Sequence, residues 1–189
     1  LTGGGHIASI RHRDRDINPL WEPSWPSIEP ALRRIADEET YGEGREAGLL
    51  SSIMGHNLCV DVFGFHSPGE EDAGMTLHGE SGMVTWEVTA CSREAEQGSM
   101  TLNARLPHSQ LQIERTFHVK NGEAHLVVDE ALTNLAGFER AIGRQQHATL
   151  GRKLLSPSPA LFSCNADKGM TFGAGDYDIT SSFKPSTAC

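Results

Sequence analysis

The stretch "LQIERTFHVKNGEAHLVVDEALTN", residues 111–134, decides the predicted fold because it consists of two alternating runs joined by a turn. Apolar side chains recur at every second position of each run, which is the period of a β-strand. They are Leu111, Ile113, Phe117 and Val119 in the first run, and Ala124, Leu126, Val128 and Leu132 in the second. Between the runs, Asn121-Gly122 is the strongest short hairpin signal, because both positions can take a positive φ. The stretch therefore predicts an antiparallel β-hairpin with a two-residue loop.

A two-residue loop also predicts which residues face each other across the hairpin. The expected pairs are Lys120–Glu123, Phe117–Leu126 and Leu111–Leu132. In this register two charged residues, Arg115 and Glu130, fall on the apolar face as diagonal neighbours, within reach of long side chains. They form an internal ion pair that satisfies charges which are costly to bury, or they line a concave cleft where Arg115 would bind a substrate.

Other parts of the chain repeat the strand period. Further strands are predicted over residues 3–10, 83–90, 99–106 and 144–150, separated by turn residues. This pattern predicts an all-β fold, an antiparallel sandwich or barrel. A helix is predicted only over Glu29–Tyr41. The preceding segment "NPLWEPSWPSIEP" is rich in proline and reads as an ordered loop; its Trp21 and Trp25 either plug the end of a sheet or stack on a sugar ring.

Length and composition limit the function. The 189 residues suffice for a single domain over residues 1–189, in which residues 152–189 show little regular pattern. A net charge of −9 argues against a nucleic-acid partner. There is no apolar run of the ~18 residues that a membrane span needs, so no membrane partner and a cytoplasmic location are predicted. The four cysteines are expected to be free thiols. An incomplete sheet would expose edges, which predicts a homodimer.

Three of the nine histidines stand beside a glycine or at the end of a predicted strand: His56, His78 and His147. The other six are predicted to be solvated: His6, His12, His66, His108, His118 and His125. Three hypotheses are open for the first set. With Glu80 they could bind a metal ion, as in small β-barrel metalloproteins, although an H-x-H core is missing. Two of them could transfer protons on a sugar. They could also hold a carbohydrate without turnover.

The segment "GMTLHGESG", Gly74 to Gly82, places His78 among glycines. An open backbone there would let a sugar hydroxyl approach the imidazole, and Glu80 would orient the ring or cap the loop. The alternative is a polar surface turn whose histidine contacts only water.

Several motifs, taken in order, resemble one known family. They are "GGGHIASI", "NPLWEPSWPSIEP", "SIMGHNLCVDVFG", "LHGE", the hairpin and "QHATLG", and they cover residues 3 to 151. This set resembles the aldose 1-epimerase (galactose mutarotase-like) superfamily, in particular its bacterial aldose-epimerase-like branch. The resemblance implies an antiparallel β-supersandwich with a sugar-binding cleft, in which the anomers of a free sugar interconvert without a cofactor.

The resemblance also assigns roles to single residues. The histidine that hydrogen-bonds the sugar matches His78, and the one that protonates the ring oxygen matches His147. Further candidates for substrate binding are His56, Glu80, Trp25 and Arg115. The chain departs from the family where Glu80 replaces a glycine and where Ala-Thr follows His147. The family's late catalytic glutamate has no counterpart, since only Asp167, Asp176 and Asp178 supply carboxylates after His147; the chain is therefore expected to be a truncated member.

Overall fold

The computed structural model describes residues 3–155 except 12–13, 15–16, 30–31, 44–45 and 65, together with residues 163 and 165; of Lys153 only the backbone is described. The chain divides into two compact units, Leu1–Pro157 and Ser158–Cys189. All of the helices and strands described below belong to the first unit. The sequence predicted a single domain with an uncertain part from residue 152 onward, and most of that part lies outside the described residues. Cys164, Cys189 and the three late aspartates lie there as well.

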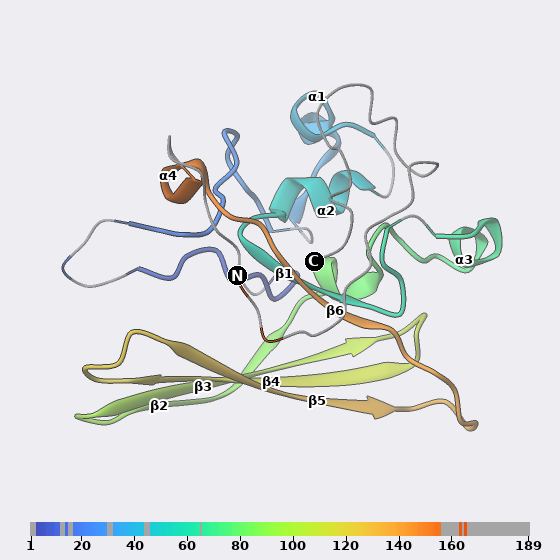
Figure 1. The fold of residues 1–189 in the computed structure, drawn as a ribbon. Helices are drawn as coiled ribbons and strands as arrows, with labels where there is room; N and C mark the ends of the chain where they lie inside the picture. The colour runs from blue at the N-terminus through green and yellow to red at the C-terminus, as the bar shows by residue number, and fades with distance from the viewer. Residues whose placement is uncertain are drawn as a thin grey trace. The chain divides into compact units, whose positions relative to one another are not determined.

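A four-stranded antiparallel sheet is the largest element of the first unit (Figure 1). Its strands are β2 (Glu87–Arg93), β3 (Gln97–Leu106), β4 (Leu111–Lys120) and β5 (Leu126–Asn134), and they lie side by side in the order of the sequence. The predicted all-β, antiparallel character is thus confirmed. The strand predicted over residues 83–90 begins later, at Glu87, and continues to Arg93 after a bulge between Val88 and Ala90.

The predicted register of the β4–β5 hairpin is wrong by two residues. Phe117 faces Val128 rather than Leu126, and Leu111 faces Asn134. The turn itself forms, with Glu123 N donating to Lys120 O, but Asn121 N donates to Glu96 O in the neighbouring loop and pairing resumes only at Leu126. A shift of two keeps every side chain on its predicted face. It also places Arg115 directly opposite Glu130, so that opposite charges meet across the strands.

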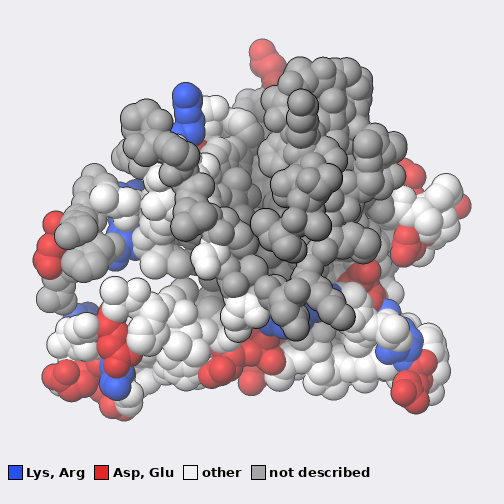
Figure 2. All heavy atoms as spheres, in the orientation of Figure 1, with Lys and Arg blue, Asp and Glu red and all other residues white. Residues whose placement is uncertain are grey.

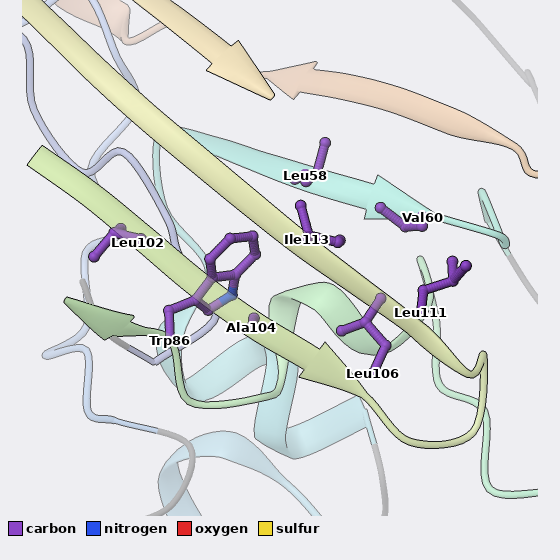
Figure 3. Packing of buried hydrophobic residues seen from close by; sticks show 8 residues of the cluster. All are labelled: Leu58, Val60, Trp86, Leu102, Ala104, Leu106, Leu111 and Ile113. Atoms are coloured by element: carbon purple, nitrogen blue, oxygen red, sulfur yellow. The ribbon is translucent and has the colours of Figure 1, made fainter. Parts of the chain in front are cut away.

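A second, two-stranded antiparallel sheet is formed by β1 (His56–Val60) and β6 (Arg144–Ala148), here called the β1–β6 ribbon. Successive side chains of a strand point to opposite faces. Leu58 and Val60 of β1 therefore share a face, and they pack into one buried cluster with apolar side chains of the four-stranded sheet (Figure 3). The cluster contains Leu58, Val60, Trp86, Leu102, Ala104, Leu106, Leu111 and Ile113. Asn57 and Cys59 lie on the opposite face of β1, which therefore points away from this cluster.

Short helices and irregular segments account for the other described residues of the first unit. The helices are η2 (Ile35–Asp37), α1 (Glu38–Tyr41), α2 (Glu46–Ser52), α3 (Pro68–Asp72), η3 (Glu80–Gly82) and α4 (Arg152–Leu155). The helix predicted over Glu29–Tyr41 is regular only from Ile35, because Arg34 is extended and the Asp37 carboxylate accepts from Arg34 N at 2.7 Å. The strand predicted over residues 3–10 is wrong: Gly4 and Gly5 take positive φ angles, which leaves isolated bridges at Gly3 and Ile7.

The surface of the described residues bears on the predicted partners. On the face shown in Figure 2, acidic and basic side chains are interspersed. Among the described residues, no helix is both long and apolar enough to cross a membrane. β2 and β5 each pair on one side only within the four-stranded sheet, so two strand edges of the kind that favours association are present. The homodimer stays a prediction.

Candidate functional site

The structure brings His78 and His147 together, although they are far apart in the sequence. His147 lies on β6, and His78 lies in the loop between α3 and η3. Their rings are stacked with centroids 5.3 Å apart and planes inclined by 27°. Phe63 lies against both, at 5.2 Å from the His78 ring and 6.0 Å from the His147 ring. Both histidines are half-buried. We call these two residues the histidine pair.

The backbone around His78 explains why the sequence places it among glycines. His78 itself has φ +64, and Gly79 follows with φ +81, in the left-handed region that side chains other than glycine rarely adopt. A Cβ on Gly79 would lie 2.1 Å from the carbonyl oxygen of Val60 at the end of β1. The glycine therefore lets the loop approach β1 closely, and this brings the His78 ring over the ribbon.

Two hydrogen bonds to Gly64 fix the His78 side chain. His78 N donates to Gly64 O at 3.1 Å, and Gly64 N donates to His78 Nδ1 at 3.0 Å. Because a neutral imidazole carries one proton, an accepting Nδ1 requires that Nε2 carries it. Partial burial lowers the pKa of His78, and the neighbouring His147 lowers it further. His78 is therefore neutral near pH 7 and presents an Nε2–H donor.

His147 is held in the opposite tautomer. Its cross-strand partner is Asn57 of β1, whose Oδ1 lies 3.0 Å from His147 Nδ1. An amide oxygen only accepts, so Nδ1 of His147 carries the proton and the lone pair of a neutral ring lies at Nε2. The histidine pair thus combines one Nε2 that donates with one Nε2 that accepts. Such a combination can bind a hydroxyl group through both its proton and its oxygen.

Glu80 does not share the surroundings of the histidine pair. Its carboxylate is 4% exposed and accepts from two backbone amides of the β3–β4 turn, His108 N at 3.1 Å and Ser109 N at 2.7 Å. Arg140 holds the same turn by donating to Ser109 O and forms a bidentate pair with Asp61 at 2.8 Å. Of the two roles expected for Glu80, the geometry favours fixing a loop over orienting His78.

His56 and Arg115 lie on the core side of the ribbon. His56 neighbours Asn57 along β1, so its side chain points to the opposite face from the histidine pair. Burial lowers the pKa of His56, and Arg115 lowers it further. Arg115 is fully buried, with Nε 2.7 Å from Glu130 Oε1 and Nη1 donating to Gly5 O at 2.9 Å. The internal ion pair expected as one interpretation of Arg115 and Glu130 is therefore present.

Trp25 lies near the C-terminal end of β6, which it reaches through its contact with Trp21. Its indole Nε1 donates to Leu50 O at 3.3 Å, and its ring meets Trp21 edge to face with centroids 5.8 Å apart. Trp21 N in turn donates to Thr149 O just beyond β6. These contacts agree with the interpretation that the tryptophans plug the end of a sheet, and Trp21 also lines a surface hollow.

Two surface hollows among the described residues lie away from the histidine pair. The larger, of about 430 Å³, lies at the β4–β5 loop and includes His118, Lys120 and His125. The smaller, of about 330 Å³, is here called the Trp21 hollow; it is lined by Arg11, Asn18, Leu20, Trp21, Glu22, Ser24, Gly151 and Arg152. We give the histidine pair more weight as a reaction site because its two imidazoles are stacked and half-buried and their hydrogen bonds fix one nitrogen of each ring. In the larger hollow, Lys120 and His125 both pair with Glu123, and His125 is 60% exposed.

The metal hypothesis gains no support from the geometry. Within the part of the chain that the structure describes, no three or more His, Cys, Asp and Glu side chains are placed to hold a metal ion. His78 and His147 meet, but His56 points to the other face of the ribbon and Glu80 is bound to the β3–β4 turn.

The sequence analysis missed several residues of this region. Asn57 and Phe63 were not singled out, because their contacts with His147 join segments whose pairing no local pattern reveals. His6 was predicted to be solvated but is 3% exposed, with Nε2 3.3 Å from Ser52 Oγ, and burial lowers its pKa to about 4. His66 is also largely buried, with Nε2 3.5 Å from Glu46. A histidine between glycines and apolar residues, as in "GGGHIASI", was the available signal for His6.

Comparisons with protein families, with characterised proteins and with solved structures gave no match to the chain. The resemblance to the aldose 1-epimerase superfamily therefore stays a prediction.

Proposed function

We propose that this protein interconverts the anomers of a free sugar by acid–base catalysis, as an aldose 1-epimerase-like isomerase of the galactose mutarotase-like superfamily. One observation carries the proposal: the stacked rings of His78 and His147 present Nε2 atoms of opposite hydrogen-bonding character. A sugar offers the matching groups, a ring oxygen that accepts and hydroxyls that both donate and accept. The β-supersandwich that the family would imply belongs to this proposal.

In the proposed reaction Nε2 of His147, which accepts in the neutral ring, first takes up a proton from the solvent, and the imidazolium then acts as the acid. Its Nε2 gives a proton to the ring oxygen as the C1–O5 bond breaks, while the anomeric hydroxyl loses its proton to water and becomes the aldehyde. Asn57 Oδ1 accepts from Nδ1 throughout, which stabilises the imidazolium before the transfer. His78 donates from Nε2 to a substrate hydroxyl and holds the sugar in place. Rotation about C1–C2 and the reverse proton transfers close the other anomer, without a cofactor.

The test is the mutarotation rate of freshly dissolved α-glucose and α-galactose, followed by polarimetry. The protein should accelerate the approach to equilibrium, and the His147→Ala variant should lose that acceleration by about a hundredfold or more, which is the range of general acid catalysis. His125→Ala is the matched control, because the His125 side chain is 60% exposed and pairs with Glu123 in the hairpin loop. No acceleration by the folded wild-type chain would exclude catalysis by these residues.

A non-catalytic carbohydrate-binding module is the second candidate, and the Trp21 hollow favours it. The indole ring of Trp21 lines this hollow together with Arg11, Asn18 and Glu22. Arg11 and Asn18 both donate to the Glu22 carboxylate, so the hollow offers planar polar groups. Aromatic faces combined with a few fixed polar groups are typical of small-molecule sites. Isothermal titration with the same sugars separates the candidates: Trp21→Ala should abolish binding by a module, whereas it should leave the rate at the histidine pair unchanged.

A further inference from the structure

Asn57 is a buried amide at the centre of the ribbon face that carries the histidine pair. It is 1% exposed and lies directly opposite His147 in the β1–β6 register. The contact between its Oδ1 and His147 Nδ1, at 3.0 Å, joins two facing side chains, so neither strand can slip without breaking it. Asn57 thus holds one specific nitrogen of the imidazole, and the other nitrogen is turned away from it.

Core packing alone does not account for an asparagine at this position. Its Nδ2 is buried and has no hydrogen-bond partner among the described residues. A buried donor without a partner lowers stability, and a leucine of similar size would fill the same space without that loss. Groups that remain unsatisfied in a folded protein call for a separate explanation. The contact with His147 supplies such an explanation, because an amide oxygen can select a tautomer of the imidazole and a leucine side chain cannot.

We propose that Asn57 is a positioning residue for His147. It holds the imidazole in the tautomer with the proton on Nδ1, which leaves Nε2 of this ring, stacked on His78, to exchange a proton with a bound hydroxyl or ring oxygen. The effect of Asn57 on catalysis rests on the proposed function, whereas the tautomer of His147 that it selects does not depend on that function. Asn57 touches no reacting atom and acts only through His147.

The other groups around His147 do not set its tautomer. His78 faces it across the stack and is kept neutral by burial, with its own Nδ1 occupied by Gly64 N. Cys59, two residues from Asn57 on the same face of β1, is a buried thiol; burial raises its pKa to about 11, so it stays uncharged. Asn57 itself does not ionise. The amide oxygen is therefore the group that distinguishes the two nitrogens of His147.

The decisive experiment is ¹⁵N NMR of the histidine rings in the wild type and in two variants, Asn57→Leu and Asn57→Asp. The wild type should show His147 mainly protonated at Nδ1 when neutral. Asn57→Leu should lose this preference and slow mutarotation about tenfold or more, while its urea midpoint stays at or above that of the wild type. Asn57→Asp should keep the tautomer and raise the pH of half-protonation of His147 by about one unit or more, because a carboxylate favours the imidazolium.

Asn103→Leu is the matched control, since Asn103 is an amide of β3 whose Oδ1 accepts from Gln112 Nε2 on the four-stranded sheet. It should change neither the His147 tautomer nor its titration. A wild-type His147 protonated at Nε2 would mean that the amide is reversed and would overturn the proposal. So would an unchanged tautomer in Asn57→Leu. If the tautomer is as proposed but the wild type does not accelerate mutarotation, the positioning role stands and the proposed function fails.

Discussion

The four-stranded sheet and the β1–β6 ribbon place buried polar groups in opposite ways. In the sheet, Arg115 and Glu130 face each other from adjacent strands of one hairpin, and their charges satisfy one another. In the ribbon, Asn57 and His147 lie ninety residues apart in the sequence, and their contact joins an uncharged amide to an imidazole, so that no ion pair forms. The sheet therefore carries polar groups that stabilise, whereas the ribbon carries polar groups to which we assign a chemical role in the proposed function. Substitutions of buried polar residues in the sheet should therefore lower mainly the stability, and substitutions at the histidine pair mainly the activity.

The largest loss of stability is expected from Arg115→Met in the sheet. The change leaves the Glu130 carboxylate, whose side chain is 2% exposed, without its fully buried countercharge. Breaking a buried ion pair from one side costs about 3–5 kcal/mol. Arg144 also contacts Glu130, so the lower end of that range is expected. Urea unfolding at pH 7 measures the change.

The double variant Arg115→Met/Glu130→Met is the control for this prediction. Replacing both charges with apolar groups removes the desolvation cost together with the attraction, so it should recover most of the lost stability. A single variant as stable as the wild type would contradict the buried ion pair as a stabilising element.

A pH-dependent loss of stability is expected from His6. This residue precedes Ile7, which bridges to His56 of the ribbon. Burial lowers the pKa of His6 to about 4, against 6.5 for an exposed histidine, so the folded chain keeps this imidazole neutral. The contribution is complete above pH 6.5 and is lost as the pH falls toward 4, because only the unfolded chain takes up the proton. Its size is about 3 kcal/mol. Urea unfolding of the wild type and of His6→Gln between pH 4 and 7 should show a flatter profile in the variant.

The exposed His125 provides the comparison for that profile. His125→Gln should keep the wild-type pH dependence, since its side chain is 60% exposed. Parallel profiles for the wild type and His6→Gln would show that His6 is solvated, as its sequence surroundings had predicted.

The same division limits what the sequence could predict. Period-two alternation assigned the faces of β4 and β5 correctly, but the Asn-Gly turn did not fix the register, because the neighbouring loop binds the Asn121 amide. Glycine neighbours and predicted strand ends singled out His78 and His147, together with His56, and the family resemblance then suggested roles for the first two. Asn57 was not predicted because its partner, His147, lies ninety residues away in the sequence. Contacts between distant segments leave no local pattern.

A smaller difference is expected between two glycines with nearly the same backbone conformation. Gly79 in the His78 loop has φ +81 and Gly122 in the hairpin loop has φ +77. A Cβ at Gly79 would meet the Val60 carbonyl, whereas a Cβ at Gly122 would meet open space. Gly79→Ala should therefore cost about 2–3 kcal/mol and Gly122→Ala about 1 kcal/mol, the left-handed conformation alone. Thermal unfolding of both variants measures the difference; equal losses would mean that the His78 loop does not rest on β1.

The smallest effect on stability should accompany a weakened hold on the substrate, in His78→Gly. His78 has φ +64, a conformation that glycine adopts without strain, so the backbone gains about 1 kcal/mol. The variant also loses the hydrogen bond from Gly64 N, worth about 1 kcal/mol. The two terms nearly cancel, and the urea midpoint should stay close to that of the wild type while mutarotation loses its hydrogen-bond donor. A large drop in stability would show that the fold needs the His78 side chain, as it needs the buried ion pair of the sheet. Backbone strain at a residue indicates a functional role only when the fold does not need that side chain. The strained backbone of His78 would then no longer be a reason to regard its loop as a site.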